Sequence, residues 1–338
     1  MPLLHSDVVV DVRALSKTYV QVQGGAFWRR QRQHVHALQE VTFQIPRGQM
    51  LAYLGRNGAG KSTTIKLLTG ILRPTSGAVS VLGLEPHRQR LQLLRRVGVL
   101  FGQRSQLWWD LPLQDSFAAV RRIYGVSEAR YRENLEEFTQ VLGLASLLPV
   151  PVRQLSLGQR MRGELVAALL FDPEVVFLDE PTIGLDVGAK EQIREFLRRI
   201  RAERRLTVVL TTHDLGDIEA LCDRVVVLDA GRIVYDASFD RMMADHGYVR
   251  TMTVSYERAP TVRAGAVEAA GWELVGQDAN RITLRYDGRR TTVPQVLAVV
   301  GEFGPVADLE VAVPRVEDVL RALYLGGVDG HPGAGGDA

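Results

Sequence analysis

A glycine-rich turn with a lysine and two hydroxyl side chains is the strongest chemical signal in the sequence. It reads GRNGAGKST and fits the pattern G-x-x-x-x-G-K-[ST], after an apolar run and before a helical pattern. Such a turn directs backbone N–H groups at phosphate oxygens, and the N-terminus of the following helix adds positive potential. The sequence therefore predicts a nucleotide-phosphate site at Gly55, Asn57, Gly58, Gly60, Lys61, Ser62 and Thr63.

Two side chains of this turn have separate expected tasks. Lys61 is expected to reach the β- and γ-phosphates of ATP, and Ser62 to ligate Mg²⁺. The alternative is a glycine-rich turn that matches the pattern by chance, at roughly 1% for a chain of this length. The strand before the turn and the helix after it lower that chance further, so we expect ATP and Mg²⁺ as ligands.

Two adjacent acids end the short apolar run VVFLDE. Asp179 could bind Mg²⁺ directly or through water, and Glu180 could polarise the attacking water as a general base. Taken alone, two acids at a strand end are more often solvated turn residues. The phosphate turn upstream reverses that preference, so we expect Asp179 to be a metal ligand and Glu180 to be the catalytic base.

Four further residues lie near the ends of predicted elements. Gln103 follows the apolar run VGVLF and could contact both Mg²⁺ and the attacking water while joining the sheet to the next helices. His213 ends the run RLTVVLTTH and could hydrogen-bond a γ-phosphate, although a histidine there is more often structural. Tyr19 could stack on a nucleotide base, or lie in the core or on the surface. Asp186 lies in the turn TIGLDVG, which could meet a neighbouring subunit.

A second polar turn, QLSLGQRM, lies nearly a hundred residues after the first. It supplies Ser156, Gly158 and Gln159. The turn could be a plain helix cap, since serine is a favoured N-cap residue. It could instead be half of another phosphate site, and these residues alone leave both interpretations open.

The elements that would position these residues alternate between strand and helix patterns. The runs GQMLAYLG, PEVVFLDE and RLTVVLTTH read as apolar strands, and STTIKLLTGIL and AKEQIREFLRRIRAE as helices. The first helix is expected to turn inward Ile65, Leu67, Leu68 and Ile71, and the second Ile193, Phe196, Leu197 and Ile200. This alternation indicates a mostly parallel, covered sheet with functional loops at the carboxyl ends of its strands.

Two other segments break this rhythm. Residues 105–170 show mainly helical patterns and are interpreted as an inserted helical lobe. From about residue 250 the patterns follow the order β-α-β-β-α-β, which suggests a small ferredoxin-like α+β domain. We therefore expect an α/β nucleotide-binding domain over 1–240, an α+β domain over 241–325 and a disordered tail over 326–338.

The bulk composition narrows the class of function. The formal net charge of +2 gives no sign of a general nucleic-acid binder, and 46% apolar residues are ordinary for a soluble globular protein. Cys222 is the only cysteine, which fits a reducing cytosol. No apolar run approaches the ~20 residues that a bilayer span needs, so a membrane role would require a partner.

Six stretches occur in the order that is typical of one family: KTY, GRNGAGKST, FGQRS, LSLGQR, VVFLDEPTIGLD and TTH. Over residues 8–238 the chain resembles the ATPase subunits of ABC transporters. The resemblance implies a P-loop NTPase fold of ABC type, ATP hydrolysis with Mg²⁺, and pairing as a homodimer or with a related ATPase subunit. It also implies membrane-spanning permease partners, a peripheral place on the cytoplasmic side of the cell membrane, and no nucleic-acid partner.

In that family the signature turn of one subunit completes the ATP site of the other. The resemblance therefore implies that Ser156 and Gly158 bind the γ-phosphate that Lys61 of the opposite subunit holds. The usual signature is Leu-Ser-Gly-Gly-Gln, and here Leu157 replaces the first glycine. Phosphate binding is expected to survive, whereas the closeness of the partner subunit could change.

Other features bear on the wider function. The stretch over 20–36 is longer than a tight hairpin needs, and its FWRR motif could lie near lipid head groups or form a solvated loop.

A soluble ABC-type ATPase acting on nucleic acid or ribosomes is the alternative function. A single P-loop and a lobe of about 65 residues fit that class poorly. The C-terminal domain resembles appendages of exporter-type ATPases, so we expect export of a substrate that the sequence does not identify.

Overall fold

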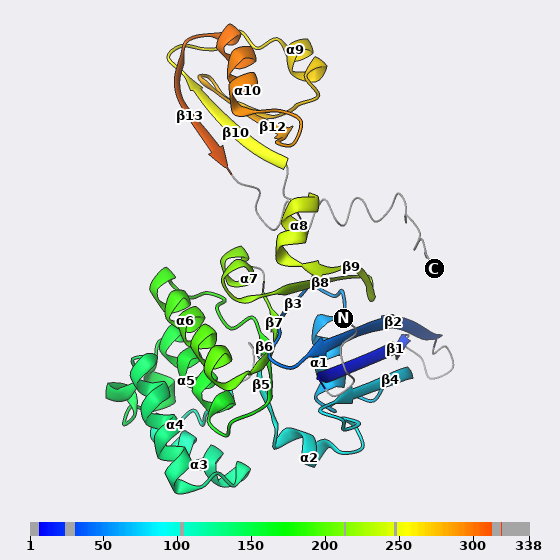
Figure 1. Cartoon of the computed structure of the whole chain (residues 1–338), viewed down its shortest axis with the longest axis vertical. Coiled ribbons are helices and arrows are strands. Elements are labelled where there is room, and N and C mark those ends of the chain that lie inside the picture. Colours follow the sequence, from blue (N-terminus) through cyan, green and yellow to red (C-terminus); the bar gives the residue numbers. More distant parts are fainter. Residues whose placement is uncertain are drawn as a thin grey trace. The chain divides into compact units, whose positions relative to one another are not determined.

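The computed structural model describes residues 7–23, 31–101, 105–212, 214–246, 249–312 and 319. The chain divides into two compact units, unit 1 over Met1–Ala237 and unit 2 over Ser238–Ala338 (Figure 1). Each unit has its own sheet structure and apolar core. Among the described residues, no helix combines the length and the apolar character that crossing a bilayer requires.

A six-stranded sheet forms the centre of unit 1, in the strand order β5-β6-β7-β3-β8-β9. Neighbouring strands from β5 to β8 pair in parallel. All residues of β3 and β7 are buried, as in strands that are covered on both faces. The prediction of a mostly parallel, covered sheet is confirmed. Its strands are β3 (Met50–Gly55), β5 (Val97–Phe101), β6 (Val175–Asp179), β7 (Thr207–Thr211), β8 (Arg224–Asp229) and β9 (Arg232–Ser238).

A second, antiparallel sheet of unit 1 has three strands in the order β2-β1-β4. These are β1 (Val8–Gln23), β2 (Gln31–Pro46) and β4 (Ser76–Val81). Phe43 of β2 packs against Tyr53 of β3 with ring centroids 5.7 Å apart, so the two sheets share one core. The paired ends of β1 and β2 account for most of the 20–36 stretch, and residues 24–30 with the FWRR motif lie outside the described residues.

Four helices accompany the two sheets: α1 (Lys61–Leu68), α2 (Arg90–Leu94), α6 (Val187–Arg204) and α7 (Leu215–Leu221). The four inward positions predicted for α6 are buried. The prediction was wrong for Ile71, which is 44% exposed. The helix ends at Leu68, and Gly70 turns the chain with a φ of 70°, so Ile71 does not continue the helical face.

The predicted lobe contains α3 (Leu113–Tyr124), α4 (Glu128–Val141) and α5 (Leu157–Leu169), with 3-10 turns at Ala145–Leu147 and Val152–Gln154. Figure 1 shows these helices grouped at one side of the six-stranded sheet, away from β1, β2 and β4. Phe138 of α4 packs edge-on against Phe196 of α6, with ring centroids 5.2 Å apart. Asp172 pairs with both Arg130 of α4 and Arg204 of α6, so apolar and ionic contacts together fasten the lobe to α6.

Unit 2 begins with a short helix and continues as a four-stranded antiparallel sheet in the order β11-β12-β10-β13. After the first helix its elements follow the β-α-β-β-α-β order of the ferredoxin-like motif. Met252, Val254 and Tyr256 alternate along β10 into its core. The tail over 326–338 lies outside the described residues. The elements are α8 (Phe239–His246), β10 (Val249–Tyr256), α9 (Ala264–Ala269), β11 (Glu273–Gln277), β12 (Arg281–Asp287), α10 (Val293–Val300), a 3-10 turn (Gly301–Phe303) and β13 (Val306–Ala312).

Candidate functional site

The carboxyl ends of β6, β7 and β3 lie at one edge of the central sheet, because these strands are parallel neighbours. They carry Asp179, Thr211 and Gly55 respectively. The sheet therefore brings the phosphate turn and the two adjacent acids to the same edge, although more than a hundred residues separate them in the sequence. Ligands of open α/β sheets bind at this edge.

The phosphate turn fits its place only because of its glycines. Gly60 is the N-cap of α1 and has a φ of 114°, a conformation that residues with a Cβ rarely adopt. A Cβ on Gly60 would lie 2.5 Å from the carbonyl oxygen of Ala37 in β2. The antiparallel sheet thus lies directly against the start of α1, and the tip of the turn from Arg56 to Gly58 stays exposed.

Lys61 is held within the turn at its own loop carbonyls. Its Nζ donates to the carbonyl oxygen of Gly55 at 2.5 Å and to that of Arg56 at 3.3 Å. Burial lowers the pKa of the Lys61 ammonium, and the carboxylates of Glu180 and Asp179 oppose this shift. The lysine therefore lies within electrostatic range of both acids, at the place where an anion with several phosphate oxygens could be neutralised.

Asp179 and Glu180 are fixed by the end of the neighbouring strand. The hydroxyl of Thr211 donates to Asp179 Oδ1 at 2.5 Å, and the Glu180 N–H donates to the Thr211 carbonyl at 2.9 Å. Glu180 has a φ of 53°, in the left-handed region that residues other than glycine rarely occupy. Such conformations persist where surrounding contacts determine them, and they cluster at functional sites.

The donor atoms at this edge fit Mg²⁺ bound together with a nucleotide. Ser62 is exposed in the first turn of α1, and Asp179 offers a carboxylate. Among the described residues, no group of three or more His, Cys, Asp or Glu side chains could hold a metal alone. Mg²⁺ usually keeps several waters and takes one or two carboxylates together with substrate phosphates. The two oxygen donors suit that mode of binding.

The second polar turn caps its own helix. Ser156 is the N-cap of α5, where its Oγ accepts from the Gln159 N–H at 3.2 Å and its own N–H donates to Gln159 Oε1 at 2.9 Å. This reciprocal arrangement is a capping box. The cap uses a lone pair of the serine, and the hydroxyl proton is left for another acceptor. Ser156 is therefore a helix cap, and this role does not compete with binding an anion.

The Ser156 turn lies beside the turn that carries Asp186. A Cβ placed on Gly184 would be 3.1 Å from Leu157 Cδ2, and one on Gly158 would be 3.5 Å from Ala189 Cβ. Asp186 caps α6, with its Oδ1 accepting from the Ala189 N–H at 2.9 Å. Leu157 remains 44% exposed, so an apolar side chain projects at the point where the family pattern has glycine.

Of the other predicted site residues, the structure describes Tyr19 but not Gln103 or His213. Tyr19 lies in β1 opposite Val35 of β2, and Lys17 Nζ lies 5.4 Å from its ring centroid. It belongs to the antiparallel sheet, whose β2 contacts the phosphate turn through Ala37. Gln103 and His213 lie outside the described residues. Phe101, two residues before Gln103, pairs with Asp179, so β5 ends at the same edge of the sheet.

Glu164 is a candidate functional residue that the sequence did not reveal. It lies in α5 and is 6% exposed, and it accepts hydrogen bonds from the Ser105 hydroxyl and from the Gln106 N–H at 2.9 Å. Burial raises the pKa of its carboxyl, while these two bonds oppose the shift. Glu164 thus ties the beginning of the lobe, just after Gln103, to the helix that begins after Ser156. Its only sequence signal is an acid within the apolar run GELVAALL.

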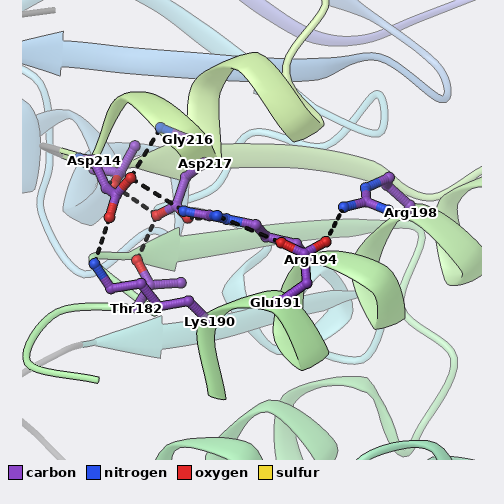
Figure 2. A network of polar contacts seen from close by, with 9 residues as sticks. Thr182, Lys190, Glu191, Arg194, Arg198, Asp214, Gly216 and Asp217 are labelled. Atoms are coloured by element: carbon purple, nitrogen blue, oxygen red, sulfur yellow. Dashed lines mark hydrogen bonds and ion pairs between the residues drawn. The ribbon is translucent and has the colours of Figure 1, made fainter. Parts of the chain in front are cut away.

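A buried polar network beside the acids was also not predicted (Figure 2). Its centre is Asp217, a carboxylate with 0% exposure in α7. Thr182, two residues after Glu180, and Arg194 of α6 both donate to it. These partners come from distant parts of the chain, so no local spacing announces them.

The chain is similar to a known family and to several of its characterised members. Residues 38–183 match the family model described as ABC transporter. The chain is 31% identical over 294 residues to the daunorubicin resistance ATP-binding protein DrrA3 of Streptomyces coeruleorubidus, covering 87% of this chain and 92% of that protein. It is 35% identical over 238 residues to the sulfate/thiosulfate import ATP-binding protein CysA of Mycobacterium bovis, covering 68% of this chain and 67% of that protein.

A solved structure is similar to this chain as well. The structure described as an ATP binding subunit of an ABC transporter is 30% identical to this chain and superposes with a TM-score of 0.60. The superposition covers 71% of this chain and 93% of the other. The likeness thus extends over nearly the whole of that protein and over an extent of this chain comparable to unit 1.

Proposed function

Because the chain belongs to the ABC transporter family as an ATP-binding subunit, we propose that it is one half of a dimeric motor that drives export through separate membrane-spanning subunits. Its enzymatic activity is ATP hydrolysis. The observation that carries the proposal is the meeting of Lys61, Asp179 and Glu180 at one sheet edge, together with an exposed Ser156 at the start of α5. A site with Lys61 alone could bind phosphate but would lack a general base for hydrolysis.

The roles within one subunit follow from the chemistry of these groups. Lys61 neutralises the β- and γ-phosphates once it leaves the carbonyls of its own loop, and backbone N–H groups of the glycine-rich turn complete the cradle. Ser62 and Asp179 hold Mg²⁺, which offsets phosphate charge when bound. Glu180 accepts a proton from the attacking water. Gln103 and His213 complete the water and γ-phosphate contacts in this proposal, and Tyr19 stacks on the base.

The other half of each site comes from a second ATPase subunit. Ser156 offers a hydroxyl proton, and Gly158 lies in the first turn of α5, where backbone N–H groups are unpaired within the helix. Asp186 lies beside this turn and would meet the same interface. In the ATPase subunits of ABC transporters the signature turn of one subunit completes the ATP site of the other, which is why we assign these donors to the partner's nucleotide.

Export is favoured by the extent of the similarities. The alignment with the daunorubicin resistance protein covers 87% of this chain and so includes most of unit 2. The alignment with the import protein covers 68%, close to the extent of unit 1 alone. Removal of a compound from the cell is one way in which an ATP-binding subunit can give resistance, so we take the likeness in unit 2 to favour export.

Inside-out membrane vesicles that contain this chain and its copurifying membrane subunits would test the direction. Their ATPase side faces the medium, so export would move solute from the medium into the lumen when ATP is added. Mass spectrometry of the medium, supplied with a mixture of solutes, would show which solute is depleted from it. Release of preloaded solute into the medium on adding ATP would instead establish import, and copurification with ribosomes or nucleic acid alone would favour the soluble alternative.

An exposed aromatic pair on the lobe is the expected contact for the membrane partner. Trp108 and Trp109 are 41% and 51% exposed, and Leu111 beside them is 41% exposed. Neither ring is buried in the lobe core, although Arg160 lies over Trp109 at 5.5 Å from its centroid. Large apolar side chains that cluster on a surface commonly mark an interaction site.

Changing both Trp108 and Trp109 to Ala should therefore weaken binding of the membrane subunits while leaving ATP binding intact. Loss of an aromatic anchor from an interface commonly costs about 2 kcal/mol or more, which corresponds to about 30-fold in affinity. Pull-down from solubilised membranes measures this effect. Leu91→Ala is the control, since Leu91 is 83% exposed in α2, outside the lobe. Unchanged partner affinity in the double variant would refute the assignment.

A further inference from the structure

Asp217 joins three segments of unit 1 through one buried carboxylate (Figure 2). Its Oδ1 accepts from Arg194 Nε at 2.8 Å, and its Oδ2 accepts from the Thr212 hydroxyl at 2.9 Å and from the Thr182 hydroxyl. Asp217 and Thr182 are 0% and 2% exposed. A carboxylate so deeply buried needs its hydrogen bonds, because an unpaired charge in the interior is strongly unfavourable. The three donors are therefore tightly tied to this position.

Two of the three segments carry proposed hydrolytic groups, and the third lies beside the predicted subunit interface. Thr182 follows Glu180 by two residues, and Thr212 follows the end of β7 and precedes His213. Arg194 belongs to α6, the helix that Asp186 caps. One side chain outside the nucleotide site thus connects the segment after the general base, the end of β7 and the helix beside the predicted subunit interface.

A second carboxylate balances the basic side chains of the network. Asp214 accepts from Lys190 Nζ at 2.5 Å, from Arg194 Nη2 at 3.1 Å and from the Gly216 N–H at 2.9 Å. Two acids thus face two basic side chains, and both bases come from α6. Burial opposes ionisation of Asp214, yet the bonds from Lys190 and the charge of Arg194 hold its pKa below the ordinary value.

The backbone conformation of Glu180 must be held by contacts on both sides of the residue. Its φ of 53° is a strained conformation that surrounding contacts must maintain. On the side of β7, its N–H is bonded to the Thr211 carbonyl at 2.9 Å. On the other side, the first side-chain anchor is Thr182, held by Asp217. Loss of that anchor would let the segment relax and move the Glu180 carboxylate away from its working position.

We propose that Asp217 is a positioning residue for hydrolysis, which holds Glu180 in place through Thr182 without touching the nucleotide. The inference rests on the proposed function, since it takes Glu180 to be the general base. It predicts that the network affects the chemical step and leaves the phosphate cradle at Lys61 unchanged. Its action should also vanish when Glu180 can no longer act as a base.

Asp217→Asn keeps the shape of the side chain and removes its charge, and Thr182→Val removes only one donor. Each is expected to lower kcat, by about 10- to 100-fold for Asp217→Asn, since a small misplacement of a catalytic group can have effects of this size. KM and the binding of ATP under non-hydrolysing conditions should stay unchanged. Asp236→Asn is the matched control. Asp236 accepts two hydrogen bonds from Arg224, 2.5 and 2.6 Å long, and this pair lies outside the three segments that Asp217 joins.

The decisive measurement repeats Asp217→Asn in a Glu180→Gln background. If Asp217 acts through Glu180, the low residual rate should not fall further, whereas a general loss of folded protein would lower both backgrounds alike. A further fall, or a normal kcat for both Asp217→Asn and Thr182→Val beside an inactive Glu180→Gln, would overturn the positioning role. A normal rate for Glu180→Gln alone would instead refute the general-base assignment. Thr182→Val keeps the test open if Asp217→Asn does not fold.

Discussion

Replacing Glu180 with glutamine should lower the rate of ATP hydrolysis by ~10²–10⁴-fold, the usual effect of losing a general acid or base. Glutamine keeps the size of the side chain but cannot accept the proton of the attacking water. The backbone bond between the Glu180 N–H and the Thr211 carbonyl, 2.9 Å long, does not involve the side chain and should persist. ATP binding through Lys61 and the glycine-rich turn should therefore remain. Steady-state phosphate release and equilibrium binding of ATP measure the two effects separately.

Glu203→Gln provides the matched control for this change. Glu203 is exposed on α6, where it pairs with Arg199 at 2.9 Å, and it lies outside the sheet edge that carries the acids. Its substitution should leave hydrolysis at the wild-type rate, because an exposed ion pair contributes little to stability. Near-normal turnover in Glu180→Gln would show that another group takes the proton, and Asp179 would be the first residue to examine.

The parallel sheet and its edge were predictable from sequence because their signals are local. Apolar runs such as VVFLDE, with the acids Asp179 and Glu180 at the end, announce buried strands whose ends face the same way. The glycines around Lys61 announce a backbone that must approach phosphate closely. Ser156 was predictable as a cap for the same reason, since a capping box spans only four residues. Each of these features depends on neighbours in the sequence.

The missing parts of the prediction depend on contacts between distant residues. Asp217 accepts hydrogen bonds from Thr182 and Arg194, which lie more than twenty residues away in the sequence. Its burial could therefore not be predicted from its polar neighbours. Glu164 likewise accepts a hydrogen bond from Ser105, at the other end of the lobe in sequence. The error at Ile71 has a different cause: the helical spacing continues in the sequence, while the backbone leaves the helix after Leu68. Periodicity does not show where a helix stops.

Ser156→Arg combined with Glu180→Gln should abolish ATP-dependent dimerisation while each monomer still binds ATP. The Glu180→Gln chain retains ATP and should form a closed dimer, because the γ-phosphate then bridges Lys61 of one subunit and Ser156 of the other. An arginine at 156 removes the hydroxyl and is too large for a closely packed phosphate contact. Sedimentation with and without ATP measures the assembly, and nucleotide binding to the same samples confirms that the cradle is intact.

Ser127→Arg is a control of the same type on another helix. Ser127 is an exposed N-cap of α4, and its side chain accepts from the Arg130 N–H, as Ser156 does from Gln159. Loss of either cap should cost about 1 kcal/mol in stability. If capping were the only role of Ser156, the two arginine variants would assemble equally well. A dimerisation defect confined to Ser156→Arg therefore separates the phosphate contact from the cap.

Mixing two inactive chains gives the sharpest test of the shared site. A Lys61→Ala dimer and a Ser156→Arg dimer each contain two defective sites. In a two-fold dimer that pairs Lys61 of one chain with Ser156 of the other, the mixed dimer has one intact site and one site with both changes. Partial recovery of ATP hydrolysis on mixing is therefore expected, whereas a site built within one chain would recover nothing. An ATP-loaded Glu180→Gln chain that stays monomeric both alone and with its membrane partner would refute the shared site, and Ser156 would then be a helix cap alone.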